Sequence, residues 1–384
     1  MSLKKGIDAL TSLRFFAAFS VFIDHYVIRP YSVDWSLSLG YIAMTFFFTL
    51  SGFVLTYAYS DDFANSQITK LKFYVGRFAR IWPLHILCLV IALPFVLTAF
   101  EENFRQTFFY LIVNMLLLQD IIPHSASIFN EPSWSISAEM FFYLCFPFLI
   151  TLAVKKKNIF NFFLFGYLLV LLGIALFFSH KQTGLEHNIS ILNIHLSLAG
   201  LFYVSPPIRL LDFMMGIFLF FIYKRLIGVN LSVKNCSYIE IFLLISLGAA
   251  YCLHPFVPQL IQLDLLYLPS VSMLLIIFSL QKGVISKLLS NQKLIFLGEA
   301  SFAFYMLQTP VKLLVGHSLN VNQVSLQFLH FIVLITLAII VHKYFEYPCY
   351  RKIRIYFGIK QQINQTISTD DISFNMLPVE KNRS

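Results

Sequence analysis

The sequence is poor in charged residues and in cysteine. Only 12% of its 384 residues are charged and 58% are apolar, whereas soluble domains carry roughly 25% charged residues. One soluble core cannot hide that much apolar surface, so the composition excludes a soluble globular domain and makes the lipid bilayer part of the solvent. The five cysteines show no CxxC spacing, which argues against a disulfide framework and against a zinc or other metal site.

The net charge of +9 is not gathered on one polar face. Lysine and arginine occur in short clusters between apolar runs, which is typical of topology signals in membrane proteins and argues against nucleic acid as a partner. The N-terminal segment is basic and then apolar, as in a signal peptide, but Arg14, Asp24 and His25 interrupt the apolar run. We therefore expect a retained first helix.

Eleven apolar runs approach the ~20 residues needed to cross a bilayer. Their ranges are 9–29, 38–59, 82–100, 106–122, 137–154, 158–179, 207–223, 237–254, 264–281, 295–315 and 326–345. The basic clusters around them are Lys4/Lys5, Lys70/Lys72/Arg77/Arg80, Lys155/Lys156/Lys157, Lys224/Arg225, Lys282/Lys287/Lys293 and Arg351/Lys352/Arg354. The positive-inside rule places all of these clusters in the cytoplasm.

The number of crossings follows from parity. Two cytoplasmic clusters must be separated by an even number of crossings, yet three apolar runs lie between the second and third clusters. The weakest run, 106–122, contains amide and acidic side chains, and we predict it to be re-entrant or interfacial. The sequence thus predicts an all-α polytopic membrane protein with about ten transmembrane helices and both termini cytoplasmic. Residues 1–355 would form the transmembrane domain and 356–384 a disordered cytoplasmic tail.

Two ionisable residues interrupt the first predicted helix. Arg14 and His25 are eleven positions apart, so at ~100° per residue they fall on nearly the same stripe, ~16 Å apart along the axis. Ionisable groups inside a span are costly and usually face a polar cavity or a partner. The pair therefore predicts a polar cavity along this helix, with a snorkelling arginine and an interfacial histidine as the alternative.

Further motifs follow in order along residues 7–348. They are FFFTLSGFVL with Ser51, Gly52 and Phe53, FYVGRFARIWPLH with Arg77 and Arg80, EPSWSISAEMFFY with Trp134, Ser135 and Glu139, PPIRLLDFMMG with Arg209, Phe213 and Gly216, LGEASFAFYMLQTP, and KYFEYP with Glu346 and Pro348. As an ordered set they resemble membrane acyltransferase family 3, which includes O-antigen and exopolysaccharide O-acetyltransferases. One position departs from the pattern, since relatives often have histidine where this chain has Gln308.

The resemblance implies cytosolic acetyl-CoA as the acyl donor. Arg77 and Arg80 are predicted in a cytoplasmic loop, on a helical turn that presents two adjacent guanidinium forks to phosphates. Coenzyme A carries both a pyrophosphate and a ribose phosphate. We predict Arg14, Arg77, Arg80 and Ser51 as donor-binding residues, with binding of anionic lipid headgroups as the alternative for the two loop arginines.

His25 is the predicted catalytic residue. An imidazole with an unperturbed pKa near ~6.5 can accept a proton from a sugar hydroxyl at neutral pH, or the ring can be transiently acylated. Glu139, at the start of the helix after the outer loop, is predicted to orient His25 or to handle a proton, with a favourable helix-dipole position as the alternative. Asp24, Asp120 and His124 are secondary candidates, and Asp24 points about 100° away from His25 on an ideal helix.

Three further motif residues have predicted structural roles. Trp134 is expected to anchor at the membrane interface, with stacking on a sugar as the alternative. Arg209 and Glu346 are expected to pair with other charges and to order the bundle.

Together with the resemblance, these residues predict a bacterial inner-membrane enzyme. It would transfer an acetyl or other short acyl group from cytosolic acetyl-CoA to a hydroxyl of an extracytoplasmic glycan or lipid-linked glycan, with polysaccharide-synthesis machinery as a further partner. Some relatives carry an esterase-like domain after the last helix, and this chain is expected to act alone or with a separate partner. A secondary transporter of a small anionic solute is the alternative, but it predicts two related halves and no internal repeat is visible. A non-catalytic membrane scaffold would not require Arg14 and His25 on one helix face.

Overall fold

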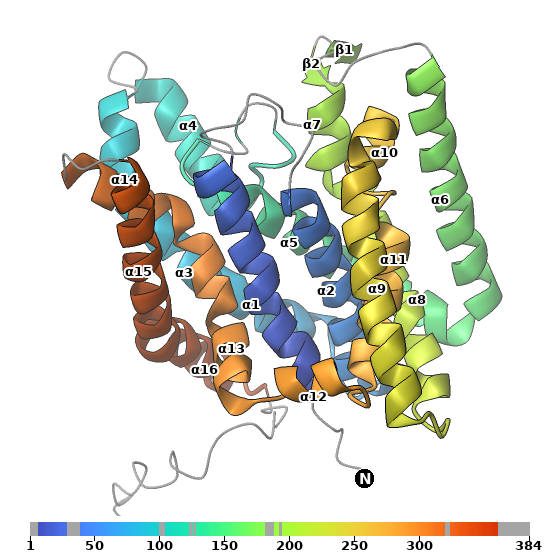
Figure 1. Ribbon diagram of the computed structural model, residues 1–384. Helices are drawn as coiled ribbons and strands as arrows, with labels where there is room; N and C mark the ends of the chain where they lie inside the picture. The colour runs from blue at the N-terminus through green and yellow to red at the C-terminus, as the bar shows by residue number, and fades with distance from the viewer. Residues whose placement is uncertain are drawn as a thin grey trace, which may run out of the picture.

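The computed structural model describes residues 7–28, 39–99, 104–122, 125, 128–180, 188–191, 194–318 and 323–359. Almost all of the described chain is helical (Figure 1). The α-helices are α1 (Asp8–Ile23), α2 (Leu39–Ala64), α3 (Lys70–Ala99), α4 (Phe104–Met115), α5 (Trp134–Lys155), α6 (Lys157–His180), α7 (Leu198–Tyr203), α8 (Pro206–Leu226), α9 (Val233–Leu253), α10 (Gln259–Gln262), α11 (Leu268–Ser279), α12 (Val284–Leu289), α13 (Gln292–Met306), α14 (Gln308–Ser318), α15 (Gln323–Val341) and α16 (Tyr347–Tyr356). Two π-helical turns, η1 (Asp24–Ile28) and η4 (His342–Glu346), and two 3₁₀ turns, η2 (Glu131–Ser133) and η3 (His254–Phe256), extend these helices.

One short hairpin departs from the all-α prediction. Strands β1 (Asn188–Ile191) and β2 (Ile194–Ser197) pair antiparallel, with Ile191 opposite Ile194. Apolar and polar residues alternate along both strands, which is the period of a strand rather than a helix. The hairpin lies in the long polar connection between α6 and α8, so it leaves the helical bundle unchanged.

Seven helices within the described residues are long and apolar enough to cross a membrane. They are α2, α3, α5 with η2, α6, α7 with α8, α9 with η3, and α15 continued through α16. The pair α13 and α14, bent by 60°, makes an eighth if it counts as one span. Helix length and apolarity alone therefore identify fewer spans than the ten predicted. Helix α4 covers the predicted re-entrant or interfacial run with only 12 residues and is not among them.

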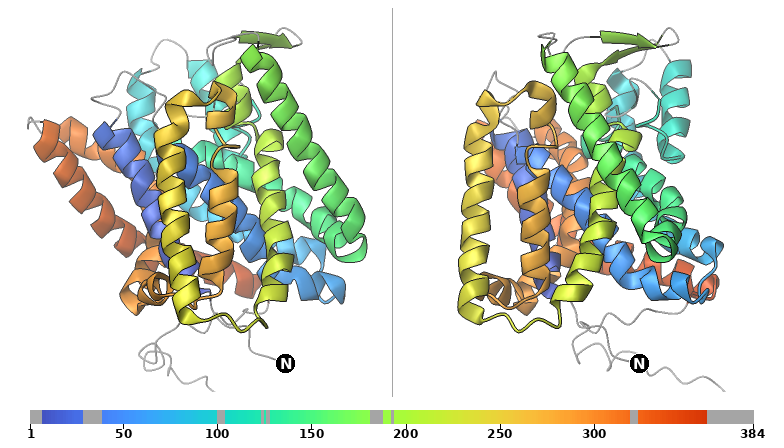
Figure 2. Two further views of the ribbon diagram at one scale, coloured as in Figure 1. Left: turned by 45° about the vertical axis from the view of Figure 1, so that its right-hand side comes forward. Right: turned by 90° about the vertical axis from the view of Figure 1, so that its right-hand side faces the viewer.

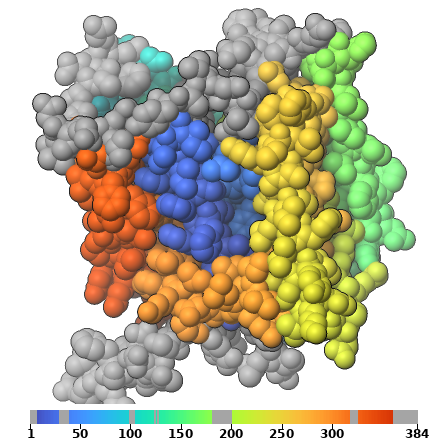
Figure 3. Space-filling model, in the orientation of Figure 1, coloured from blue at the N-terminus to red at the C-terminus, as the bar shows by residue number. Residues whose placement is uncertain are grey.

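The bundle has two distinct ends, which we name by the elements found there. Helices α12 and α16 and the start of α1 lie at one end, called the inner end, while α7, β1 and β2 lie at the other, called the outer end (Figure 1). Helix α2 is central, because 72% of its apolar stretch is buried, against 17% for α6 and for α9. Figure 2 shows α6 and α9 on the outside of the bundle. On the face in Figure 3, α1 is visible between α15 and α9.

Helix α3 begins earlier than the apolar pattern predicts. It starts at Lys70, so Arg77 and Arg80 lie within the helix rather than in a loop before it. Pro83, which would be favoured in a first turn, instead lies inside α3. The extension is amphipathic and buries Phe73 completely, which explains why the helix continues beyond the apolar run.

Two glycines let α2 and α8 approach backbone to backbone. A Cβ atom on Gly52 would collide with the carbonyl oxygen of Phe213, and one on Gly216 would collide with the carbonyl oxygen of Thr49. Small residues serve this purpose in membrane bundles, where close van der Waals packing drives helix association. The contact also fixes the rotation of α2 and hence the direction of Ser51.

We expect Gly52→Ala to destabilise the protein by about 1–3 kcal/mol, because the added methyl group must separate α2 from α8. The thermal unfolding midpoint of the purified protein in detergent measures this effect. Gly173→Ala on α6 is the matched control, since a Cβ there meets open space. Equal midpoints for the two variants would contradict the proposed backbone contact.

Candidate active site

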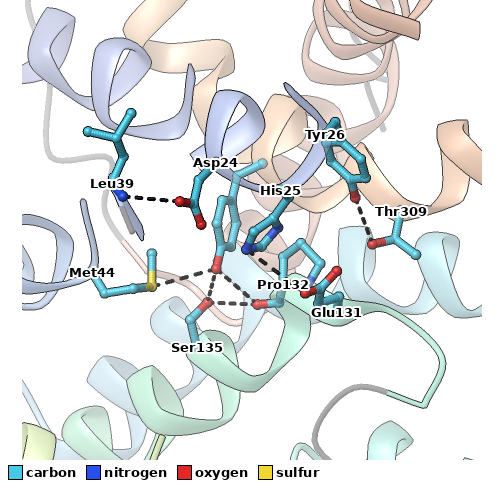
Figure 4. A network of polar contacts seen from close by, with 10 residues as sticks. Asp24, His25, Tyr26, Leu39, Met44, Glu131, Pro132, Ser135 and Thr309 are labelled. Atoms are coloured by element: carbon cyan, nitrogen blue, oxygen red, sulfur yellow. Dashed lines mark hydrogen bonds and ion pairs between the residues drawn. The ribbon is translucent and has the colours of Figure 1, made fainter. Parts of the chain in front are cut away.

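His25 lies in the π-helical turn η1, which continues α1 at the outer end. Such turns are rare and occur often at functional sites. The Nε2 atom of His25 lies 4.0 Å from Oε1 of Glu131, and the two side chains are 10% and 41% exposed. Figure 4 shows them pointing toward each other. A largely buried imidazole facing a carboxylate is suited to proton transfer, because the carboxylate stabilises the imidazolium that forms.

The turn that carries Glu131 is held in place by buried side chains. Tyr305 on α13 donates its hydroxyl to the carbonyl oxygen of Pro132 at 3.1 Å. Gln119 Nε2 donates to the carbonyl oxygen of Ser133 at 2.8 Å. These bonds fix η2 against the bundle, and so they position the Glu131 carboxylate opposite His25.

Asp24 contacts a different part of the bundle. Its Oδ1 atom accepts a hydrogen bond from the backbone N–H of Leu39 at 3.1 Å (Figure 4). This bond satisfies one of the free N–H groups at the start of α2. As the helical periodicity predicts, Asp24 points away from the partner of His25, and it joins α1 to α2.

Arg14 lies in α1, eleven residues before His25 and toward the inner end. It is within electrostatic range of Arg80 on α3, of Glu139 and Tyr143 on α5, and of Glu346 in η4. The shared stripe of Arg14 and His25 stays a prediction.

Glu139 belongs to the arginine group and not to the surroundings of His25. Its Oε1 atom accepts hydrogen bonds from Ser51 Oγ at 3.0 Å and from the Tyr143 hydroxyl at 2.5 Å. At 1.5 Å per residue along α5, Glu139 lies ~12 Å inward of Glu131. The predicted direct orientation of His25 by Glu139 is therefore corrected, since Glu131 occupies that place. A proton-handling role for Glu139 stays a prediction.

The two arginines of α3 face different partners. Arg80 pairs with Glu346 in the π-helical turn η4, and Glu346 also accepts from His342 Nδ1 at 3.0 Å. Arg77 donates to the Tyr59 hydroxyl at 3.0 Å. The charge pairing predicted for Glu346 is thus confirmed.

Some guanidinium donors in this group have no hydrogen-bond partner among the described residues. The Nε atom of Arg77 is buried without a hydrogen bond, and the contacts of the described residues include no hydrogen bond or ion pair for Arg14. Unpaired cationic donors inside a bundle are costly. They fit a site for an anion, because guanidinium groups bind phosphate oxygens in pairs.

Between the two groups lies a line of neutral polar side chains. The Tyr305 hydroxyl oxygen lies 3.0 Å from Ser135 Oγ and is in electrostatic range of both Glu131 and Glu139. A polar track therefore runs along α5 from His25 and Glu131, through Tyr305 and Ser135, to Glu139 and the arginines.

A second buried charge cluster lies beside this track. Arg209 is fully buried, with NH2 3.1 Å from Asp212 Oδ2 and NH1 3.2 Å from Asp264 Oδ1. Thr45 donates to the same Asp264 oxygen at 3.0 Å. This confirms the charge pairing predicted for Arg209, which joins α8 and α2 to the segment before α11.

Trp134 does not anchor the protein at the membrane interface. It is only 7% exposed, and its ring centroid lies 5.9 Å from that of Phe48 and 5.0 Å from that of Tyr203. The 3₁₀ turn containing Pro132 directs the start of α5 into the bundle, so the interfacial prediction is wrong.

Of the secondary candidates, Asp120 is described and His124 lies outside the described residues. Both carboxylate oxygens of Asp120 are buried, with no hydrogen-bond partner in the described part of the chain. Burial raises the pKa of Asp120 well above its usual value, against the opposing effect of Arg209.

Gln308, where the resemblance expects histidine, has a clear structural role. It is fully buried, and its Nε2 atom donates to the carbonyl oxygen of Ala18 on α1 at 3.1 Å. Its own carbonyl oxygen lies 3.0 Å from His330 Nε2 on α15. Gln308 therefore connects the bend between α13 and α14 to α1.

Sequence reasoning missed three residues of this site: Glu131, Tyr143 and Tyr305. Tyr143 could have been predicted from the sequence, because a residue four positions after Glu139 lies on the same face of the helix. The positions of Glu131 and Tyr305 in the site depend on how separate helices pack together. Residue spacing along the sequence does not predict that packing.

A family model described as an acyltransferase domain matches residues 7–342. The match covers most of the chain, so this protein belongs to the acyltransferase family. It is similar to the acyltransferase MdmB of Streptomyces mycarofaciens, with 29% identity over 330 residues, which cover 82% of this chain and 80% of MdmB.

Two relatives from Staphylococcus aureus carry O-acetyltransferase names. The putative O-acetyltransferase SACOL0978 is 25% identical over 327 residues, 78% of this chain and 50% of that protein. The O-acetyltransferase OatA is 24% identical over 368 residues, 90% of this chain and 57% of OatA. The chain thus spans about half the length of these two relatives. No solved structure matches the chain.

We expect Glu131→Gln to lower the turnover rate of acyl transfer about ten- to hundredfold. A charge pair at ~4 Å contributes about 1 kcal/mol in water and about 4 kcal/mol in a partly buried site. The neutral amide of glutamine removes this stabilisation of the positively charged His25. The rate is measured in membrane vesicles, together with the unfolding midpoint, which should not change. Asp61→Asn removes an exposed carboxylate at the inner end of α2 and should leave the rate unchanged. Full activity in Glu131→Gln would exclude Glu131 as the partner of His25.

Proposed function

We propose that this protein transfers an acetyl or other short acyl group from cytosolic acyl-CoA to a hydroxyl of an extracytoplasmic glycan or lipid-linked glycan. The observation that carries the proposal is the polar track, which joins arginines with unpaired donors at one depth of the bundle to His25 at another. The names of the two Staphylococcus relatives support O-acetyl transfer as the reaction class.

The orientation proposed here puts the inner end in the cytoplasm of a bacterial inner membrane. The described basic clusters support it, because they lie where α3 begins, where α5 and α8 end, and in α12 and α16. Ten crossings result if α1 with η1, α11 and the bent pair α13–α14 cross together with the seven long helices. Both chain ends are then cytoplasmic, and α4 is the segment that does not cross.

Arg77 and Arg80 would bind the phosphates of the donor, and Arg14 would face the arm that carries the acyl group. The fit rests on the Nε atom of Arg77, which is buried without a hydrogen-bond partner among the described residues, and on Arg14, for which the described contacts include no hydrogen bond. Ser51 and Tyr143 hold Glu139 beside the arginines through hydrogen bonds. One carboxylate thus lies near these cations, and it is too few to neutralise all of their charge. The acyl group extends outward along the polar track toward His25.

His25 carries the chemistry in either of two orders. Its Nε2 faces Glu131, so Nδ1 is the ring nitrogen that acts on the substrate. As a general base, Nδ1 takes the proton of the acceptor hydroxyl while that oxygen attacks the acyl carbon and the thiolate leaves; the proton then passes to the sulfur. As a nucleophile, Nδ1 attacks the acyl carbon and the thiolate leaves. The acceptor hydroxyl then attacks the acyl-imidazole, the imidazole is released, and the hydroxyl proton passes to the thiolate. Glu131 stabilises the positive imidazole in both.

The acceptor would approach from the outer end, where η1 and η2 lie. Glu131 is the partly exposed member of the pair, so the hydroxyl can reach the site from that side. We propose a glycan made by polysaccharide-synthesis machinery as the acceptor, following the resemblance of the sequence motifs to glycan O-acetyltransferases.

The proposal is tested by supplying labelled acetyl-CoA to vesicles that contain the protein and a glycan acceptor. We expect His25→Ala to lower label transfer by at least about a hundredfold while acetyl-CoA binding is retained. The double variant Arg77→Ala/Arg80→Ala should instead weaken donor binding by about tenfold or more, because charged hydrogen bonds are lost.

The matched control is His180→Ala, which removes an exposed histidine at the end of α6 and should transfer label normally. Transfer by His25→Ala at the wild-type rate would refute the chemical role. No label transfer by the wild-type protein would refute acetyl-CoA as the donor.

A further inference from the structure

The start of α14 packs beside the turn that carries His25. The hydroxyl oxygens of Tyr26 in η1 and Thr309 in α14 lie 3.2 Å apart (Figure 4). Tyr26 directly follows His25, and the centroids of their rings are 5.9 Å apart. Helix α14 also contacts η2, the turn that contains Glu131. The first turns of α14 therefore border the pair formed by His25 and Glu131.

Lys312 lies three residues further along α14 and reaches back to η1. Residues three apart share a helix face, so Lys312 lies on the face of Thr309. Its Nζ atom is 5.0 Å from the centre of the Tyr26 ring, where the ring attracts the cation. Added to the distance between the Tyr26 and His25 rings, this places the ammonium group within about 11 Å of the His25 ring. A sugar bound at His25, or its neighbour in a glycan, is thus within reach of Lys312.

The charge of Lys312 is not neutralised by the described part of the chain. The side chain is exposed, and the described contacts include no hydrogen bond or ion pair for it. The carboxylate of Glu131 faces His25 instead (Figure 4). The Tyr26 ring holds the ammonium group in place but is itself neutral. The three N–H donors of Lys312 therefore have no acceptor among the described residues.

The position of Lys312 is unusual among the lysines of this protein. All other lysines in the described ranges lie where α3, α6 and α9 begin, where α5 and α8 end, or in the segments 282–293 and 343–352. These places belong to the inner end, whereas α14 lies toward the outer end (Figure 1). In the orientation proposed above, a lysine outside opposes the topology signal of the other clusters. Membrane topology therefore does not account for Lys312.

The chemistry of the ammonium group indicates what it binds. It is a compact charge with three donors, and carboxylate and phosphate oxygens are its strong partners. The acyl donor is proposed to enter from the inner end, so the molecule that meets Lys312 is the acceptor.

We propose that Lys312 binds an anionic group of the acceptor glycan, a sugar carboxylate or a phosphate. The inference rests on the proposed function and deepens it, since it gives the acceptor a charge. Tyr26 and Thr309 position the lysine beside His25. Lys312 contacts the acceptor away from the reacting hydroxyl, so its loss raises the KM for the acceptor and leaves kcat unchanged.

The test uses vesicles that contain the full chain and labelled acetyl-CoA, with a deacetylated bacterial surface polysaccharide that the wild-type protein acetylates. This acceptor is offered as extracted, after reduction of its carboxylates to alcohols, and after removal of its phosphates with hydrofluoric acid. One of the two treatments should lower kcat/KM of the wild-type protein about three- to tenfold, as loss of a partly exposed charged contact requires. The treatment that does so identifies the anionic group.

Lys312→Gln should lower kcat/KM for the extracted polysaccharide by the same factor, through a higher KM. With the form that lacks the anionic group, Lys312→Gln and the wild-type protein should agree, because no charge is left for Lys312 to bind. Lys312→Arg keeps the positive charge and should keep the preference for the charged form. Added salt should weaken that preference in the wild-type protein, because salt screens exposed charges.

Lys343→Gln is the matched control. Lys343 is also exposed, and its Nζ atom lies 5.5 Å from the centre of the Tyr344 ring. It belongs to η4, next to α16 at the inner end, so its loss should leave the acceptor preference unchanged.

An equal loss in Lys312→Gln with the charged and the neutralised acceptor would overturn the proposal, because it would indicate contact with lipid headgroups or an effect on the fold. So would an undiminished preference in Lys312→Gln, or a wild-type protein that acetylates all three forms equally well. The proposed function fails in a different way, since the wild-type protein would then acetylate no polysaccharide.

Discussion

The cost of holding arginine side chains inside an apolar bundle governs the arrangement of the other polar groups. Arg14, Arg77 and Arg80 come from two helices and meet the carboxylates of Glu139 and Glu346. Each carboxylate is in turn held by a hydroxyl or an imidazole. The attraction between these charges offsets the cost of desolvating them only when their geometry is held closely. The helices around the network therefore have little freedom to move apart.

Backbone contact between α2 and α8 supplies part of that rigidity. Gly52 and Gly216 bring the two helices together, and Ser51, next to the first glycine, then meets Glu139 on α5. Two adjacent residues of one motif thus have different roles: Gly52 packs against α8, and Ser51 donates a hydrogen bond to Glu139. The outer group is held in the same manner, since Tyr305 on α13 fixes the turn that presents Glu131 to His25.

Much of the fold could be predicted from apolar runs and basic clusters, because the bilayer restricts both strongly. The predicted contact of Glu139 with His25 and the interfacial position predicted for Trp134 failed at the same point, where the chain passes from an outer loop into α5. Their surroundings depend on how far α5 is inserted and how the Pro132 turn directs it, which are properties of packing between helices. The early start of α3 was missed because its first turns are amphipathic rather than apolar.

The two π-helical turns have a consequence for comparing this chain with its relatives. Each such turn amounts to a single residue inserted into an α-helix, and one insertion rotates everything beyond it by about 100°. His25 lies in one of these turns and Glu346 in the other. A gap-free alignment with a relative that lacks either insertion would pair residues on different sides of the helix. Equivalent positions near residues 24–28 and 342–346 should therefore be matched by the direction of the side chain and not by their order in the chain.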